Sequence, residues 1–334
     1  MNPARLKLVG RIAVSVALIL WLAGRLDWAG LIRHFTDVDW RWLPVVVLCS
    51  PLCLVLLTVR WLVFLRARQL KPSPGGLLRL LWAGQFFNTF LPGAVGGDVF
   101  KAVAVGRLVP DAPLVAGATV VVDRFCAFLT LALLALVGAS LQHKLLQAVF
   151  ASGIVLPRGV LLAAAGLVVF ALALVWGIGR SAWYHRRRET WRQNARLAAR
   201  AVLAGLRDWP TFAWASILSL GIHLANFSVF FALARMLRLD IGFGQVILIM
   251  PVLLMIAMLP VTINGHGLRE IILVTYFHWQ EIGGSGVGSA EAAVAVSLLY
   301  VTNDLLWSLP GGIGLALGRR AETPVCRPLP HHGA

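Results

Sequence analysis

The stretch Gln85–Phe100, QFFNTFLPGAVGGDVF, constrains the fold most, because it interrupts a long apolar region and cannot form an ordinary membrane helix. Pro92 lacks a backbone N–H, and Gly96 and Gly97 weaken a helix further. A bilayer holds no water to satisfy a broken backbone, so such a break must be buried in protein or line a wet cavity. In transporters, broken helices of this kind hold the substrate. We therefore expect the functional site here.

Composition places the chain among polytopic membrane proteins. Of its 334 residues, 59% are hydrophobic and 13% are charged, about half the charged share of a soluble domain. The net charge of +16 comes from basic residues clustered in short connections between apolar runs. That distribution indicates cytoplasmic loops beside an anionic leaflet rather than a nucleic-acid surface. The four cysteines have no spacing typical of disulfides or zinc sites, and we expect no metal and no cofactor.

Several apolar runs are long enough to cross a bilayer, which takes about 20 residues. There are about six such runs, and they cover residues 8–24, 43–65, 113–141, 157–179, 211–235 and 290–317. Two further apolar regions, 77–107 and 243–280, are interrupted by proline and glycine. The expected fold is an all-α polytopic membrane protein, with a single domain over residues 1–320 and a flexible tail over 321–334.

The distribution of charge predicts how the two interrupted regions run. Segment 180–207 is rich in arginine and should be cytoplasmic, with an amphipathic surface helix over Thr190–Leu206. If region 77–107 crossed the membrane completely, segment 180–207 would end up outside. Segment 180–207 is cytoplasmic only if 77–107 enters the membrane from the cytoplasm and returns to the same side. Region 243–280 should do the same from the outer side, because Gly267–Trp279 is too short to cross the bilayer.

The two halves of the chain then share one order: a span, a broken re-entrant hairpin and a second span. Repeat A covers about 43–141 and repeat B about 211–317, and helix 157–179 with segment 180–207 links them. This order indicates an inverted-topology repeat, with the binding site between the hairpins near the midplane. Both termini should be cytoplasmic.

Polar residues in and near the two breaks are the candidate substrate-binding residues, and none is assigned a catalytic role. They are Asn88, Gly96, Gly97, Asp98, Lys101, Asp123, Arg124, Asn264, Gly265, Gly267, Arg269, Glu270 and Asp304. Arg269 is the first choice for an anionic headgroup, because its planar fork binds phosphate oxygens in pairs. Glu270 either orients Arg269 or acts as a proton-linked carboxylate.

Structural explanations compete with these roles. Asp98 is a suitable N-cap for a half-helix beginning near Val99, whose N–H groups would also attract an anion. Lys101 could snorkel to the surface. Asp123 and Arg124 point apart on one helix, so each needs a partner elsewhere, for which Asp98 or Lys101 is a natural candidate. Packing or snorkelling explains the other buried polar residues, Arg60, His223 and Asn226.

These motifs match a known family. They are F-x-N-x-x-L-P-G-x-x-G-G-D at Phe86–Asp98, D-R at Asp123–Arg124, and L-P-x-x-x-x-G-x-G-x-R-E at Leu259–Glu270. With them the chain resembles, over nearly its whole length, the flippase-like membrane domain of lysylphosphatidylglycerol synthases, which also occurs as a stand-alone protein. Two residues depart from the family pattern: Lys101 stands where arginine is common, and His266 where a small or apolar residue is.

The resemblance implies a role in moving lipids between leaflets. In fused relatives the domain is implicated in moving an aminoacylated phospholipid that a separate soluble domain synthesises. No such domain is expected here, so aminoacyl-lipid synthesis is not expected either. Stand-alone relatives are tied to other lipids, including polyprenyl-linked sugars and hopanoids, so the substrate does not transfer with the fold.

The function expected from these observations is lipid transport in the bacterial cytoplasmic membrane, without an ATP-hydrolysing part. The substrate would be an anionic phospholipid or a polyprenyl-phosphate-linked lipid. Two alternatives stay open. The protein could be a membrane transferase that acts on a lipid-linked donor. It could also be a non-transporting partner of a lipid-modifying enzyme or glycosyltransferase, recruited through segment 180–207.

Overall fold

The computed structural model describes residues 21, 24, 27–70, 72–90, 96–108, 113–141, 188–257, 267–284 and 287–316, and every element in these ranges is a helix. The elements are α2 (Trp28–Arg33), the 3-10 helix η1 (Trp40–Trp42), α3 (Leu43–Ala67), α4 (Pro74–Phe90), α5 (Gly96–Leu108), α6 (Pro113–Leu141), α10 (Arg188–Arg207), α11 (Trp209–Met236), α12 (Phe243–Ala257), α13 (Leu268–Trp279) and α14 (Val287–Ala316).

Four helices within the described ranges are long and apolar enough to cross a membrane. They are Trp40–Ala67, which joins η1 to α3, Pro113–Leu141, Trp209–Met236 and Gly288–Ala316. These helices coincide with four of the expected spans, at 43–65, 113–141, 211–235 and 290–317. The other two, 8–24 and 157–179, lie outside the described residues.

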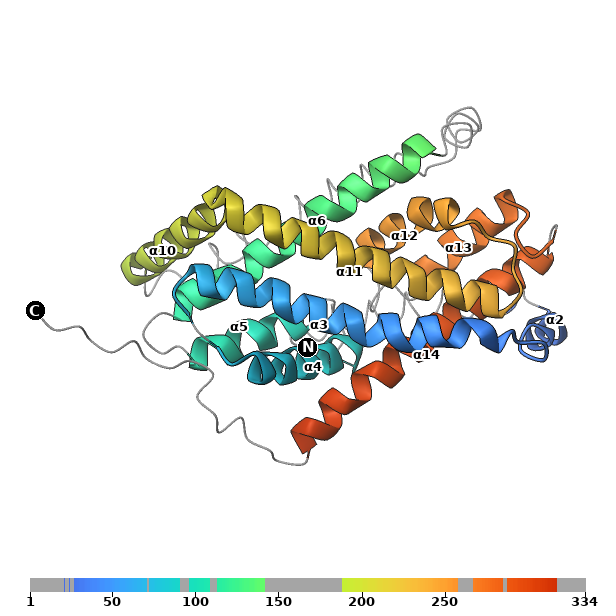
Figure 1. Cartoon of the computed structure of the whole chain (residues 1–334), viewed down its shortest axis with the longest axis horizontal. Helices are drawn as coiled ribbons and strands as arrows, with labels where there is room; N and C mark the ends of the chain where they lie inside the picture. Colours follow the sequence, from blue (N-terminus) through green and yellow to red (C-terminus); the bar gives the residue numbers. More distant parts are fainter. Residues whose placement is uncertain are drawn as a thin grey trace, which may run out of the picture.

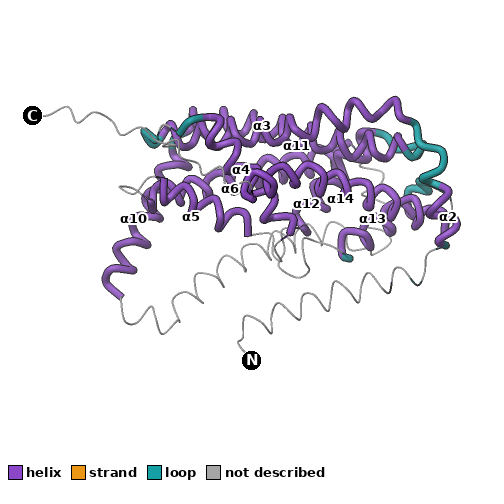
Figure 2. Tube along the Cα trace, turned by 90° about the horizontal axis from the view of Figure 1, so that it is seen from below, coloured by secondary structure: helices purple, strands orange, loops and turns teal. Residues whose placement is uncertain are grey.

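The first long helix of each half, α3 and α11, run side by side along the length of the bundle (Figures 1 and 2). They are antiparallel, because the N–H of Asp39, just before α3, donates to the carbonyl oxygen of Met236 at the end of α11 (2.8 Å). The Sγ of Cys53 contacts the carbonyl oxygen of Ile222 at 3.7 Å, nearer the middle. This helix pair is the centre around which the shorter helices are arranged.

Helices α4 and α5 form an antiparallel hairpin. The rings of Phe87 and Phe100, near the break between the helices, lie 4.7 Å apart. Leu77 near the start of α4 and Val105 near the end of α5 belong to one buried cluster. The open end of this hairpin lies at the same end of the bundle as α10 (Figure 1).

Helices α12 and α13 form a second hairpin at the other end of the bundle, on the side of α2 (Figure 1). Gln245 in the first turn of α12 and Gln280 just after α13 share a side-chain hydrogen bond of 2.8 Å. The hydroxyl of Tyr276 donates to the carbonyl oxygen of Gln245 (3.1 Å). The chain therefore returns with α13 to the end from which α12 departs.

Each hairpin packs on the last helix of the opposite half. Helix α4 lies so close to α14 that a Cβ at Gly311 would collide with the backbone of Trp82. The indole Nε1 of Trp82 donates to the carbonyl oxygen of Trp307 (2.7 Å). Helix α12 also lies close to α6, since a Cβ at Gly138 would be 2.7 Å from the carbonyl oxygen of Ile247. The halves are therefore interlocked.

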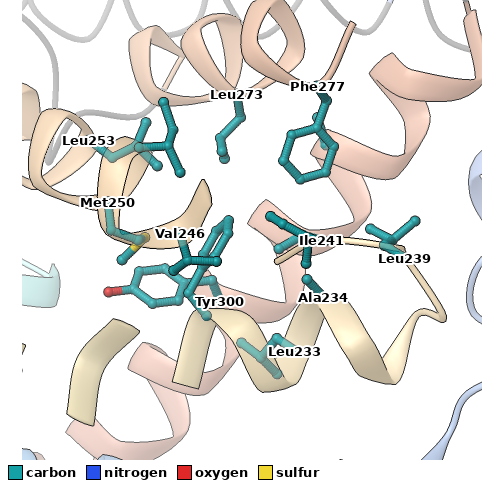
Figure 3. Packing of buried hydrophobic residues seen from close by; sticks show 14 of the residues in the cluster. Leu233, Ala234, Leu239, Ile241, Val246, Met250, Leu253, Leu273, Phe277 and Tyr300 are labelled. Carbon is teal, nitrogen blue, oxygen red and sulfur yellow. The ribbon is translucent and has the colours of Figure 1, made fainter. Parts of the chain in front are cut away.

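The largest buried cluster joins α11, α12, α13 and α14, and includes Leu233, Met250, Leu273 and Tyr300 (Figure 3). Helix α10 lies outside it and packs on α6 and α11. Its range, Arg188–Arg207, confirms the amphipathic helix predicted over Thr190–Leu206. Leu206 and Val202 contact a smaller apolar cluster at this end of the bundle.

Candidate functional site

Two cavities lie inside the bundle, and Asp304 on α14 belongs to the wall of both. The first, called the Arg269 cavity, has a volume of about 110 Å³. Its polar lining residues are Arg269, Ser297, Tyr300 and Asp304. The second, called the Asn303 cavity, has a volume of about 160 Å³. Its polar lining residues are Ser50, Cys53, Trp82, Gln85, Asn226, Asn303, Asp304 and Trp307.

Both volumes are well above the roughly 10–15 Å³ that one water molecule needs. Residues of α3, α4, α11 and α14 line the Asn303 cavity, and residues of α11, α12, α13 and α14 line the Arg269 cavity. Asp304 stands near the middle of α14, and Asn226 somewhat past the middle of α11. The cavities therefore place polar groups deep in the bundle, where an unpaired charge is costly and generally functional.

Arg269 is held in one orientation in the first turn of α13. Its Nη2 donates to the carboxylate of Glu270 and to the hydroxyl of Ser297, both at 3.1 Å. Its Cζ lies 5.5 Å from the centre of the Tyr300 ring, within range of a cation–π interaction. The residue is only 8% exposed. Among the described residues, its Nε has no hydrogen-bond partner.

Glu270 connects Arg269 to the start of the helix. One carboxylate oxygen accepts from the backbone N–H of Gly267 at 2.6 Å, which satisfies a free donor at the helix N-terminus. The other accepts from Arg269 and from the Ser297 hydroxyl (2.7 Å). Gly267 has a φ of +87°, a conformation that favours glycine. The turn at Gly267 and the carboxylate of Glu270 thus position the guanidinium at the cavity.

The polar lining of the Asn303 cavity includes the amide side chains of Gln85, Asn226 and Asn303. The hydroxyl of Ser50 donates to Oδ1 of Asn303 (3.1 Å), joining α3 to α14. The hydroxyl of Tyr300 donates to Oδ1 of Asn226 (3.0 Å), joining α14 to α11. Sequence reasoning assigned Asn226 to packing, whereas the structure places it in the wall of this cavity.

Asp123 pairs with Arg60 of α3. Nε and Nη2 of Arg60 donate to the two carboxylate oxygens at 2.7 and 2.9 Å, and Nη1 donates to the hydroxyl of Ser219 (2.6 Å). The pair is buried, with side-chain exposures of 3% for Arg60 and 8% for Asp123. The expectation that Arg60 serves packing or snorkelling was therefore wrong, and the partner of Asp123 among the described residues is neither Asp98 nor Lys101. The fork links α3, α6 and α11.

The remaining candidates occupy other places in the fold. Helix α5 begins at Gly96, so Gly97 and Asp98 lie in its first turn, and the expected start near Val99 was wrong. The side chain of Asp98 lies outside the described residues, as do Asn264, Gly265 and His266. Three other candidates are described: Lys101 is buried in α5, and Asn88 in α4 and Arg124 in α6 are half-buried.

Comparison with known proteins identifies the family. A sequence model of the lysylphosphatidylglycerol synthase TM region matches residues 8–315. The chain belongs to this family. A UPF0104 membrane protein from Methanothermobacter thermautotrophicus is 25% identical over 319 residues, which cover 88% of this chain and 89% of the relative. The resemblance inferred from the motifs is thereby confirmed, and the chain is a helical, multi-pass membrane protein of this family.

Sequence reasoning did not identify Ser297 and Tyr300, which contact Arg269. A signal for them was present. Ser297, Tyr300 and Asp304 are spaced three and four residues apart on an apolar helix, so they lie on one face. Polar residues spaced three and four apart inside an apolar helix indicate the face of that helix that lines a cavity.

Proposed function

We propose that this protein is a membrane lipid transporter that moves an anionic phospholipid or a polyprenyl-phosphate-linked lipid between leaflets. The headgroup enters the polar cavities between the hairpins, and its tails stay in the bilayer. The observation that carries the proposal is the buried guanidinium of Arg269, which lines a cavity and keeps an unsatisfied Nε donor among the described residues. A phosphate oxygen there would satisfy a donor whose isolation costs about 1–3 kcal/mol.

The packing of the helices supports an inverted-topology repeat. Helices α3 to α6 and α11 to α14 have the same order of long, short, short and long elements. Their contacts are reciprocal, since α4 packs on α14 and α12 on α6. We infer that each hairpin is re-entrant, because its two arms open at the same end of the bundle and neither arm exceeds 17 residues.

The charges at the two ends of the bundle support an orientation. Arginines gather at the end that holds α10, among them Arg66, Arg68, Arg196, Arg200 and Arg207. Acidic residues are frequent at the opposite end, among them Asp27, Asp37, Asp39, Asp240 and Glu281. We infer from the positive-inside rule that the α10 end faces the cytoplasm. We propose the bacterial cytoplasmic membrane as the location.

Cysteine labelling tests this orientation in a variant without native cysteines. R196C and G75C should react from the same side of a sealed vesicle, and E281C from the other side. Residue 75 lies at the start of α4, so its side also reports whether that hairpin opens toward α10. Labelling of R196C and E281C from the same side would contradict the topology.

Lipid movement is tested in proteoliposomes that contain phosphatidylglycerol with a fluorescent acyl chain. A membrane-impermeant reductant bleaches only the outer leaflet, so protein-dependent movement appears as bleaching beyond half of the signal. Arg269→Met should abolish this excess, and Arg269→Lys should retain part of it, because lysine keeps the charge and loses the fork. Arg33→Met, at an exposed arginine of α2, is the matched control and should behave as the wild type. If bleaching stops at half of the fluorescence for every anionic lipid tested, the proposal is refuted.

A further inference from the structure

Asp304, which is half-buried, differs from the buried Asp123 in how its charge is balanced. Asp123 on α6 is neutralised by the two-point ion pair with Arg60, which comes from the first long helix of the same half. In the second half, the corresponding helix α11 brings the neutral Asn226 to the cavity that Asp304 lines. Within the described part of the chain, Asp304 forms no ion pair and no hydrogen bond through its carboxylate. Its charge is therefore the less compensated of the two.

The groups that face Asp304 add little compensation. Arg269 on α13 shares its cavity, but the Nη2 of Arg269 is already engaged by Glu270 and Ser297. Cys53 on α3 faces the other cavity, and Tyr300 is the titratable neighbour on α14 itself. Among the described residues lining either cavity, α4, α11 and α12 contribute no titratable side chain.

An anion in the Arg269 cavity therefore meets an arginine on one wall and, on another, a carboxylate that has no ion-pair partner among the described residues. The cavity holds only about 110 Å³, so a phosphate bound to Arg269 lies close to Asp304. Repulsion between like charges at such a separation is strong in a low-dielectric interior. Neutralising Asp304 removes this repulsion. Occupancy of the cavity by an anion and neutralisation of the carboxylate must then favour each other, by thermodynamic linkage.

We propose that Asp304 takes up a monovalent cation, Na⁺ or a proton, from the Asn303 cavity, and that this cation is coupled to binding of the anionic headgroup in the Arg269 cavity. The inference rests on the function proposed above and names how that site is regulated. The geometry suits it, because one carboxylate is reached from two cavities of different character. The Asn303 cavity offers oxygen ligands from Ser50, Gln85, Asn226 and Asn303 around Asp304, a set of donors that suits hard cations.

The test measures binding of a short-chain phosphatidylglycerol to the purified full-length chain in nanodiscs. One series replaces choline chloride with sodium chloride at pH 8 and constant ionic strength. A second series lowers the pH from 8 to 6 in choline chloride. We expect the dissociation constant to fall by about tenfold in one of the two series, which is within the usual range of coupling between sites. A response to sodium identifies Na⁺ as the cation, and a response to pH alone identifies the proton.

Variants separate the carboxylate from the rest of the site. Asp304→Asn should bind the lipid with an affinity that no longer depends on sodium or pH, because its side chain is already neutral. Asn226→Leu, which keeps the carboxylate and removes one oxygen ligand, should weaken a sodium response and leave a proton response in place. Asp240→Asn, at a fully exposed aspartate, is the matched control and should keep the wild-type dependence.

The outcomes distinguish the two proposals. If the lipid affinity of the wild type depends on neither sodium nor pH, the proposed cation site is wrong, and the proposed lipid transport is unaffected. Dependence that survives in Asp304→Asn would also overturn it, since another group would then be responsible. Failure of the wild type to bind the lipid under every condition would refute the proposed function, and the coupling with it.

Discussion

Removing both partners of the Arg60–Asp123 pair should destabilise the protein by clearly less than the sum of the effects of removing each partner alone. The pair is buried at 3% and 8% side-chain exposure, and two hydrogen bonds of 2.7 and 2.9 Å join its charges. Asp123→Leu leaves the guanidinium with only the hydrogen bond to Ser219, and Arg60→Met leaves the carboxylate without its fork. Stranding a buried charge in this way costs about 3–5 kcal/mol.

The separation of the two charges also gives the size of the coupling free energy between the Arg60 and Asp123 substitutions. Unit charges about 4 Å apart attract by about 4 kcal/mol at an effective dielectric constant of 20. The double variant loses this attraction together with the two desolvation penalties. We therefore expect it to be destabilised by at least 2 kcal/mol less than the sum of the single variants, roughly half of that attraction.

The assay is a double-mutant cycle on equilibrium unfolding in mixed micelles, with SDS as denaturant and circular dichroism as readout. The matched control is the pair Arg238–Asp37, which has a similar length of 2.8 Å but side-chain exposures of 61% and 71%. Its coupling should stay below about 1 kcal/mol, as for other exposed pairs. A coupling at Arg60–Asp123 no larger than that of the control would refute the reasoning.

Five glycine substitutions test two helix contacts and one backbone conformation. Gly138→Leu should destabilise the folded protein by about 1–3 kcal/mol or more, because the new Cβ would collide with the backbone of α12. Gly117→Leu on the same helix is the control. Its side chain would enter open space, so this substitution should be nearly neutral. Gly311→Leu should likewise disrupt the contact of α14 with α4, with Gly314→Leu as its neutral control. Gly267→Ala should destabilise by about 1–3 kcal/mol through its φ of +87° alone. SDS unfolding measures the stability of all five variants. Equal destabilisation by Gly138→Leu and Gly117→Leu, or by Gly311→Leu and Gly314→Leu, would contradict the packing described.

Local features of the sequence predicted the four long helices, the breaks and α10, but not the short helices α2 and η1. Hydropathy predicted the four described spans because each is a continuous apolar run. Proline and glycine predicted the break before α13, where Gly267 adopts a positive φ. Arginine spacing predicted α10. The start of α5 was misplaced by three residues, because Gly96 and Gly97 were counted as part of the break and are helical.

Contacts between distant helices could not be predicted in this way. Arg60 and Asp123 are 63 residues apart, and nothing local specifies that α3 and α6 bring them together. The same holds for Asn226 and Asn303, which meet in one cavity only because α11 and α14 pack in a particular register. Arg269 was identified as a candidate because its own neighbours, a glycine break and a following glutamate, already mark a polar helix start.

If the protein transports lipid as proposed, the interlocking of the hairpins limits how it could alternate between an inward-open and an outward-open form. If one half tilted rigidly past the other, Trp82 would lose its bond to Trp307 and α12 would separate from Gly138 in the same step. A less disruptive motion keeps α4 with α14 and α12 with α6 as two mixed blocks, each drawn from both halves. Any mechanical cycle would then run along the boundary between these blocks, not between the repeats.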